Sequence, residues 1–247
     1  MKVLIADKFP EPYIQKLRDS DIEVIYEPKL GENDIPKFTT EVDTVVVRST
    51  KVNTDAIMNS TKLNLIVRAG AGYNNIDVKA ANKKGVYVAN CPGKNSIAVA
   101  ELAMGLIVAI DRKIPDNVID FNNGVWNKDK YSKAEGLAGK SLAIIGYGNI
   151  GKELAKRALA FGIKVYAKDV LPITDENVIV FESLEEVLPK VDIISLHLPA
   201  NAQTKGMFNE KMFALLKPGT ILVNTSRAEV IDEEAMVNAI KEKNLKV

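Results

Sequence analysis

Three glycines in the segment GYGNIG, residues 146–151, follow a short apolar run and precede a helical pattern. Gly146 allows a sharp turn, Gly148 lets the backbone approach a pyrophosphate, and Gly151 lets a helix pack closely on a sheet. The N-terminus of such a helix attracts anions because its first N–H groups have no partner within the helix. The predicted pyrophosphate contacts come from Gly146, Gly148, Asn149, Ile150 and Gly151.

An acidic residue, Asp169, lies 18 positions after Gly151, at the end of a strand expected over 163–167. A carboxylate there can bind a ribose 2′-hydroxyl and repels a 2′-phosphate, which favours NAD over NADP. Lys168 could bind that phosphate, but side-chain alternation along a strand directs it away from Asp169. We therefore predict NAD as the cofactor. The alternative, a flexible glycine loop, does not account for the strand, helix and acid in order.

The elements that position these residues alternate along the whole chain. Apolar strand-like runs and helical patterns follow one another, which predicts α/β architecture with parallel sheets. The expected strands include 2–6, 22–26, 44–48, 63–67, 86–89, 191–199 and 220–227. Because ligands bind outside the carboxyl ends of parallel strands, the polar residues at those ends are candidates for a site. By position these are His197, Thr225, Ser226 and Arg227.

A break in the pattern at residues 90–93, with Pro and Gly, predicts a hinge. We expect a first domain over 1–92 and a second, cofactor-binding domain over 93–247. The helix expected over 96–112 is apolar almost all round, so it should be buried on every side. It is either a core helix of the same chain or a subunit interface.

Composition excludes several classes of partner. The sequence has 33 Lys and Arg against 32 Asp and Glu, so nucleic acid or an anionic membrane is not expected and a small molecule is. Cys91 is the only cysteine, which suits a reducing compartment. The first residues lack a signal-peptide pattern, and the longest apolar run, 97–110, contains Glu101 and is too short to cross a bilayer. We expect a cytoplasmic protein with no metal site.

Several ordered blocks give a resemblance that covers essentially the whole chain. They are VVVRSTKVN (45–53), the segment 68–115 that begins RAGAGYNNID, GYGNIG (146–151), HLP (197–199) and NTSRAEVIDEEA (224–235). In these blocks the sequence resembles the D-isomer-specific 2-hydroxyacid dehydrogenases. The resemblance implies two Rossmann-like or flavodoxin-like, doubly wound domains with a cleft between them, and a homodimer formed through helix 96–112.

The resemblance also implies an oxidoreductase that passes hydride from a 2-hydroxy acid to NAD, with Arg227 binding the substrate. A guanidinium can hold a carboxylate and a neighbouring oxygen together, although a structural salt bridge is the alternative role for Arg227. The substrate carboxylate would also meet the backbone N–H groups of Gly70, Ala71 and Gly72, which otherwise form a plain turn.

Arg48 and Lys51 match positions near the substrate phosphate in members of the family that act on 3-phosphoglycerate. They favour a phosphorylated 2-hydroxy acid, 3-phosphoglycerate in serine biosynthesis, over lactate or glyoxylate. Reduction of glyoxylate or hydroxypyruvate is the alternative activity. Solvated surface cations are the other interpretation of Arg48 and Lys51.

Three departures from the family pattern matter. Ala228 stands where the family has glycine, so the loop is strained if it needs a positive φ. His197 is the only histidine, and it matches a residue on the cofactor side of the site rather than the family's general base. Pro199, Thr225 and Ser226 also match positions on the cofactor side. The family's catalytic Glu and His, its last strands and its return helix would follow Val247. Two hypotheses remain, a dehydrogenase represented by an incomplete chain and a non-catalytic NAD-binding regulator or inactive paralogue.

Overall fold

The computed structural model describes residues 1–247, which form two compact units, Met1–Asn95 and Ser96–Val247. Each unit contains one five-stranded sheet in which every strand pair is parallel. The predicted α/β class with two parallel sheets is therefore confirmed.

The first unit has strand order β2-β1-β3-β4-β5, which is the flavodoxin-like doubly wound order. Its strands are β1 (Lys2–Ile5), β2 (Glu23–Tyr26), β3 (Thr44–Val47), β4 (Leu65–Arg68) and β5 (Tyr87–Asn90). Its helices are α1 (Glu11–Arg18), α2 (Ile35–Phe38), α3 (Thr54–Met58) and α4 (Val78–Lys84).

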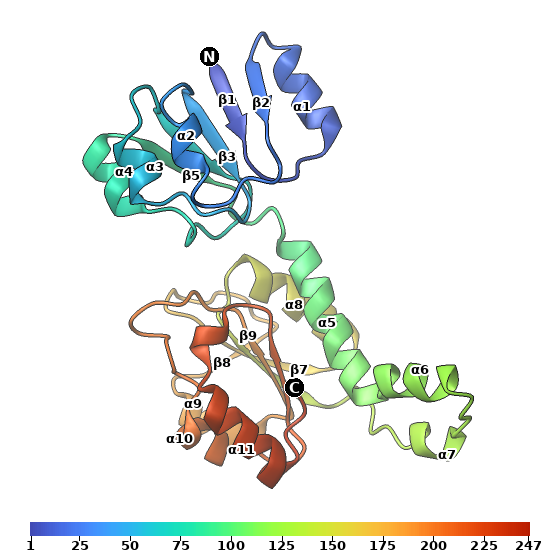
Figure 1. Ribbon diagram of the computed structural model, residues 1–247. Coiled ribbons are helices and arrows are strands. Elements are labelled where there is room, and N and C mark those ends of the chain that lie inside the picture. Colours follow the sequence, from blue (N-terminus) through green and yellow to red (C-terminus); the bar gives the residue numbers. More distant parts are fainter. The chain divides into compact units, whose positions relative to one another are not determined.

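Helices cover both faces of this first sheet. Alternate residues of β1 separate the faces, since Leu4 packs in the cluster beneath α2, α3 and α4, whereas Val3 and Ile5 pack against Ile14 of α1. Figure 1 shows α1 on one side of the sheet and α2 to α4 on the other. Burial on both faces explains the continuous apolar strand sequences such as TVVV in β3.

The second unit has strand order β10-β9-β6-β7-β8. Its strands are β6 (Ser141–Ile145), β7 (Lys164–Lys168), β8 (Ile179–Val180), β9 (Ile193–Leu196) and β10 (Ile221–Asn224). Its helices are α5 (Ser96–Arg112), α6 (Ile114–Asn122), α7 (Lys128–Tyr131), α8 (Asn149–Ala160), α9 (Leu184–Val187), α10 (Glu210–Ala214) and α11 (Glu233–Lys243), with short 3₁₀ turns at Leu188–Lys190 and Ala228–Val230.

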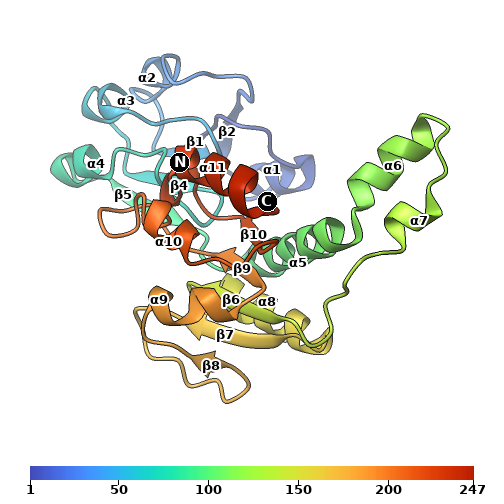
Figure 2. The ribbon, with the colours of Figure 1, turned by 90° about the horizontal axis from the view of Figure 1, so that it is seen from below.

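Two apolar clusters lie on opposite faces of the second sheet. Helices α5 and α8 pack on one face, with Ile107 and Leu154 fully buried. Helices α9, α10 and α11 cover the other face around Phe208 and Phe213, whose rings meet edge to face at 5.4 Å. Figure 2 shows α5 and α8 together beside the sheet, with α10 and α11 on its other side.

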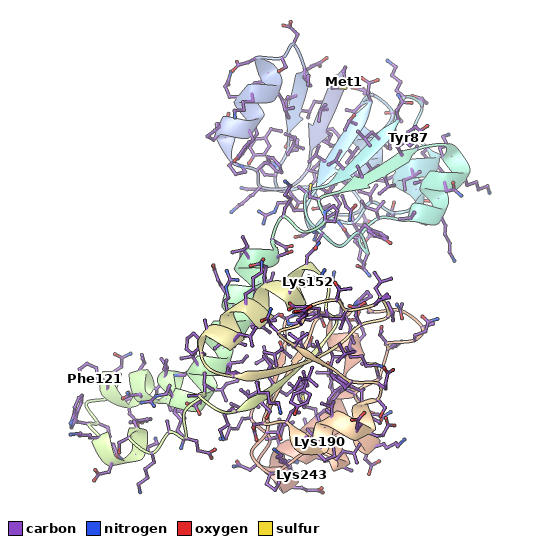
Figure 3. All side chains as sticks on the ribbon, turned by 180° about the vertical axis from the view of Figure 1, so that it is seen from behind. Met1, Tyr87, Phe121, Lys152, Lys190 and Lys243 are labelled. Atoms are coloured by element: carbon purple, nitrogen blue, oxygen red, sulfur yellow. The ribbon has the colours of Figure 1, made fainter.

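Helix α5 has the predicted bounds. The prediction that it is buried on every side is wrong for the single chain, which leaves part of the helix exposed. Only the face toward α8 and the sheet is covered, whereas Ile97, Leu102 and Leu106 are 57%, 56% and 38% exposed. Helix α6, which the sequence pattern did not reveal, has no buried residue. Figure 3 shows Phe121 of α6 far from the sheet of its own unit.

The last helix of the second unit has a side-chain cap. Asp232 caps α11 by accepting a hydrogen bond from the Ala235 N–H at 3.1 Å. Lys246 then pairs in parallel with Ile221 of β10 as an isolated bridge. None of the helices combines the length and the hydropathy that crossing a membrane requires.

Candidate functional site

The glycine turn, residues 146–151, depends on two close backbone contacts. Gly146 has a φ of +99°, and a Cβ built there would lie 2.4 Å from the carbonyl oxygen of His197. A Cβ on Gly151 would lie 2.3 Å from the carbonyl oxygen of Gly146. Because real side-chain carbons do not approach a backbone oxygen so closely, only glycine allows β6, β9 and α8 to meet in this way.

Gly148 differs from the other two glycines because it faces open space. It is the N-cap of α8 and provides no side-chain cap, and a Cβ there would meet no atom within 4 Å. The adjoining cavity of about 480 Å³ is lined by Tyr147, Gly148, Asn149, Lys152, Asp169 and residues 171–175. A helix N-terminus without a side-chain cap, next to a glycine with open space around it, can bind a pyrophosphate. The cavity volume is typical of a cofactor site.

Asp169 follows β7 and lines the same cavity. Its Oδ2 accepts a hydrogen bond from the Tyr147 N–H at 2.6 Å, and its Oδ1 accepts one from the Leu171 N–H at 3.0 Å. Lys168 points elsewhere and donates to the carbonyl of Glu182. The acid at the strand end is therefore held in place by backbone groups, with Lys168 directed away as alternation predicted.

His197 follows β9 and lies beside the glycine turn. Its Nε2 is 2.9 Å from the Ser195 hydroxyl, and its Nδ1 is 3.5 Å from the Thr225 hydroxyl. Burial lowers the pKa of His197 to about 4, so its imidazole is neutral at physiological pH. A neutral ring with a hydroxyl beside each nitrogen suits a structural or cofactor-side role better than proton transfer.

The loop after β10 is organised by Asn224, which sequence reasoning overlooked. Its Oδ1 accepts hydrogen bonds from the Ser226 N–H at 3.0 Å and from the Ser226 hydroxyl at 2.7 Å, and its Nδ2 donates to the Arg227 carbonyl at 2.9 Å. Arg227 Nη1 donates to the Ser226 carbonyl at 2.9 Å. Ala228 is not among the residues with positive φ, so the expected strain does not arise.

Pro199 lies farther along the loop after β9 and is exposed. Its carbonyl accepts a hydrogen bond from the Thr204 hydroxyl at 2.5 Å. Of the candidates in the second unit, the structure thus brings together the glycine turn, Asp169, His197 and Thr225, with Ser226 and Arg227 in the adjoining loop.

In the first unit, Asp7 holds the loop that carries Arg48. Its carboxylate accepts hydrogen bonds from the N–H groups of Arg48 (2.6 Å), Ser49 (3.0 Å) and Thr50 (3.1 Å). Burial raises the pKa of Asp7, but these hydrogen bonds outweigh it and hold the pKa below its ordinary value. Arg48 itself is exposed.

Lys51 and the turn at 70–72 differ in part from what the sequence suggested. Lys51 lies 3.6 Å from Glu32 in a surface ion pair. The Gly70 N–H donates to the Arg68 carbonyl at 2.8 Å, so this donor is already used within the turn. Among residues 1–247, the Ala71 and Gly72 N–H groups donate to no other backbone group.

Arg68 is a second residue that the sequence reasoning missed. It ends β4, in register with Val47 just before Arg48, and its Nη1 lies 1.6 Å from where a Gly70 Cβ would be. Its Nε is buried without a hydrogen-bond partner. Its place at the carboxyl end of a strand, directly before the glycine turn RAGAG, was the available signal.

Parallel sheets, a glycine turn at a helix N-terminus and an acid ending the next strand define a dinucleotide-binding protein of Rossmann type. The family model for the NAD-binding domain of D-isomer specific 2-hydroxyacid dehydrogenases matches residues 104–247. The chain therefore belongs to the D-isomer-specific 2-hydroxyacid dehydrogenase family and contains its NAD-binding domain.

Relatives support this membership over nearly the whole chain. A hydroxypyruvate reductase from Thermotoga maritima is 40% identical over 97% of this chain and 78% of its own length. A D-3-phosphoglycerate dehydrogenase from Methanocaldococcus jannaschii is 37% identical over 98% of this chain, which spans 47% of that relative. The crystal structure of the TT0316 protein from Thermus thermophilus is similar with a TM-score of 0.91 and 28% identity, over 99% of this chain and 79% of that one.

Two glycine substitutions should separate folding from cofactor binding. We expect Gly151→Ala to destabilise the fold by at least ~1–3 kcal/mol, because the clash with the Gly146 carbonyl exceeds the gain of about 1 kcal/mol in helix propensity. Gly148→Ala should leave the melting temperature unchanged and weaken NADH binding about tenfold or more, since the methyl occupies pyrophosphate space. Calorimetry measures the stability of each variant, and fluorescence titration measures its affinity for NADH. Equal effects of the two variants on stability and affinity would contradict the different roles assigned to Gly148 and Gly151.

His197 gives a direct test of the polarity of this site. The only histidine signal in a proton NMR titration should move with a midpoint near pH 4 in the folded protein and near 6.5 in urea. Because the unfolded chain takes up this proton first, the stability associated with His197 should fall as pH drops from about 6.5 toward 4. A folded-state midpoint near 6.5 would show that water reaches the ring.

Proposed function

We propose that this protein oxidises 3-phosphoglycerate to 3-phosphohydroxypyruvate, the first oxidation of serine biosynthesis, with NAD as the oxidant. Bound NAD supplies the hydride acceptor for this reaction. The residues proposed for the cofactor are those of the glycine turn with Asp169, joined by His197, Pro199, Thr225 and Ser226. Membership of the family and the 37% identical phosphoglycerate dehydrogenase support the proposal.

Arg227 is the proposed substrate-orienting residue of the second unit. Its guanidinium can hold the carboxylate and the oxygen at C2 through paired N–H donors, which fixes the carbon for reaction and stabilises charge on the oxygen. The Asn224 hydrogen bonds support this role, because they fix the backbone from which Arg227 extends.

The first unit is the proposed substrate domain. The observation that carries the choice of a phosphorylated substrate is the pair Arg48 and Arg68, which stand at the carboxyl ends of neighbouring strands. Neither makes an ion pair within residues 1–247. An arginine guanidinium can hold a phosphate through paired N–H donors, and the Ala71 and Gly72 N–H groups can take the substrate carboxylate. Lys51 is a secondary contributor because it already forms a surface ion pair with Glu32.

The alternative activity is reduction of hydroxypyruvate or glyoxylate. Two observations favour it. A hydroxypyruvate reductase of which this chain spans 78% is 40% identical to it, and Lys51 forms an ion pair with Glu32 rather than standing free for a phosphate. The two activities differ in whether the substrate carries a phosphate, so phosphate recognition decides between them.

Substitutions in the two units should affect two substrates differently. Arg48→Gln should lower kcat/KM for 3-phosphoglycerate about 10- to 100-fold, the value of a lost charge-assisted hydrogen bond, and leave D-glycerate almost unchanged. Arg227→Lys should lower kcat/KM for both substrates, because lysine cannot form the bidentate contact. Initial rates of NADH formation measure both effects.

The matched control is Lys83→Gln, which removes an exposed cation from α4 of the same unit. Higher kcat/KM for D-glycerate or hydroxypyruvate than for the phosphorylated compounds in the unaltered protein would favour the alternative activity. NADH binding without turnover of any of them would favour an NAD-binding regulator.

A homodimer through α5 is also proposed. Large apolar side chains are exposed on the outer face of α5 and on α6, namely Ile97, Leu102, Val118, Ile119 and Phe121. Exposed apolar side chains gathered on neighbouring helices support an interface. We expect light scattering to give twice the mass of one chain, and Leu102→Glu to give the monomer. Val170→Glu, at a residue 98% exposed elsewhere in the unit, is the control. A monomeric unaltered protein would contradict this proposal.

A further inference from the structure

Tyr147 connects two acidic residues that line the cavity beside the glycine turn. Only 3% of Tyr147 is exposed. Its backbone N–H donates to Asp169 Oδ2 at 2.6 Å, and its hydroxyl donates to Asp175 Oδ2 at 2.7 Å. One side chain and its own backbone therefore contact both the start and the far end of the segment 169–175.

That segment forms one wall of the cavity and has few other attachments. Val170 and Leu171 are 98% and 71% exposed, and Ile173 alone packs against the core of the unit. The opposite wall consists of the glycine turn and Lys152 in the first turn of α8, labelled in Figure 3. The wall is therefore held near its two ends by the hydrogen bonds from Tyr147 and between them by the packing of Ile173.

Asp175 is fixed as an ionised acceptor. Its Oδ1 accepts hydrogen bonds from the N–H and the side-chain amide of Asn177, both at 3.0 Å. The hydrogen bond from the Tyr147 hydroxyl lowers the pKa of Asp175 most, and the two hydrogen bonds from Asn177 lower it further. Burial raises the pKa of Tyr147. At neutral pH the phenol therefore donates and the carboxylate accepts.

The charged side chains lining the cavity are two carboxylates, Asp169 and Asp175, and one ammonium group, Lys152. A ribose with a free 2′-hydroxyl adds no charge to this set. A 2′-phosphate would add up to two negative charges beside two fixed carboxylates in a partly enclosed space, where charges interact more strongly than in water.

We propose that Tyr147 and Asp175 form a latch that holds the wall 169–175 against the glycine turn, and that Asp175 joins Asp169 in excluding a 2′-phosphate. Tyr147 is a positioning residue and Asp175 is a specificity residue. The proposal deepens the proposed function, since it rests on the adenosine end of NAD occupying this cavity.

Fragments of the cofactor separate the two roles. Isothermal titration with 5′-AMP and with adenosine 2′,5′-bisphosphate measures the affinity of each variant for a ribose without and with the 2′-phosphate. Tyr147→Phe removes only the hydroxyl, so 5′-AMP should bind about 3- to 10-fold more weakly. Asp175→Asn removes the charge and keeps a partner for the phenol, which can donate or accept. It should raise affinity for the bisphosphate about tenfold relative to 5′-AMP.

Glu176→Gln is the matched control, because it removes the same charge from the next residue, which does not line the cavity. Its two affinities should equal those of the unaltered protein. KM for NAD should rise in Tyr147→Phe and stay unchanged in Glu176→Gln, and melting temperatures should show that every variant is folded.

The outcomes distinguish the latch from the proposed position of the cofactor. Unaltered 5′-AMP affinity in Tyr147→Phe would overturn the latch, and an unaltered affinity ratio in Asp175→Asn would overturn the specificity role. Failure of 5′-AMP to bind the unaltered protein, or binding unaffected by Gly148→Ala, would overturn the cofactor position and the latch with it.

Discussion

The second unit depends on the close contact between the backbone of the glycine turn and its neighbours. Gly146 meets the His197 carbonyl and Gly151 meets the Gly146 carbonyl at separations that leave no room for a Cβ. This contact places the start of α8 directly over the carboxyl edge of the sheet. From there Tyr147 reaches Asp169, so the uncapped helix end and the acidic strand end line one cavity. Without both glycines, α8 would lie farther from the sheet. The helix N-terminus and Asp169 could then not contact one ligand together.

Local spacing made much of this predictable. The strand, the glycine turn, the helix and Asp169 follow one another within thirty residues, and each has a sequence signature that depends on few distant contacts. Helix α5 was predictable for the same reason, because its hydrophobic pattern is long and uninterrupted. What covers its outer face was not predictable, since hydropathy shows that a face avoids water without showing which surface buries it. The exposed Ile97 and Leu102 illustrate this limit.

The residues that sequence reasoning missed act through contacts between distant segments. Asp7 holds a loop more than forty positions away, and Tyr147 reaches Asp175 across 28 positions. A lone aspartate or tyrosine carries no spacing signal, so its partner appears only when the fold brings the two together. Arg68 was hidden differently, because a strand-ending arginine beside a glycine turn looks like part of the turn until its guanidinium is seen lying on Gly70.

The two sheet edges differ in charge in a way that matches the proposed chemistry. The first sheet presents Arg48 and Arg68 at neighbouring strand ends, whereas the cavity of the second unit presents Asp169 and Asp175. In the proposed function, the first set would attract an anionic substrate and the second would accept an uncharged ribose. His197 stays neutral through burial and adds no charge that would disturb this separation. Under the proposed function, the two carboxylates of this cavity would disfavour a phosphate on the ribose, whereas the α8 N-terminus and Lys152 would favour the pyrophosphate.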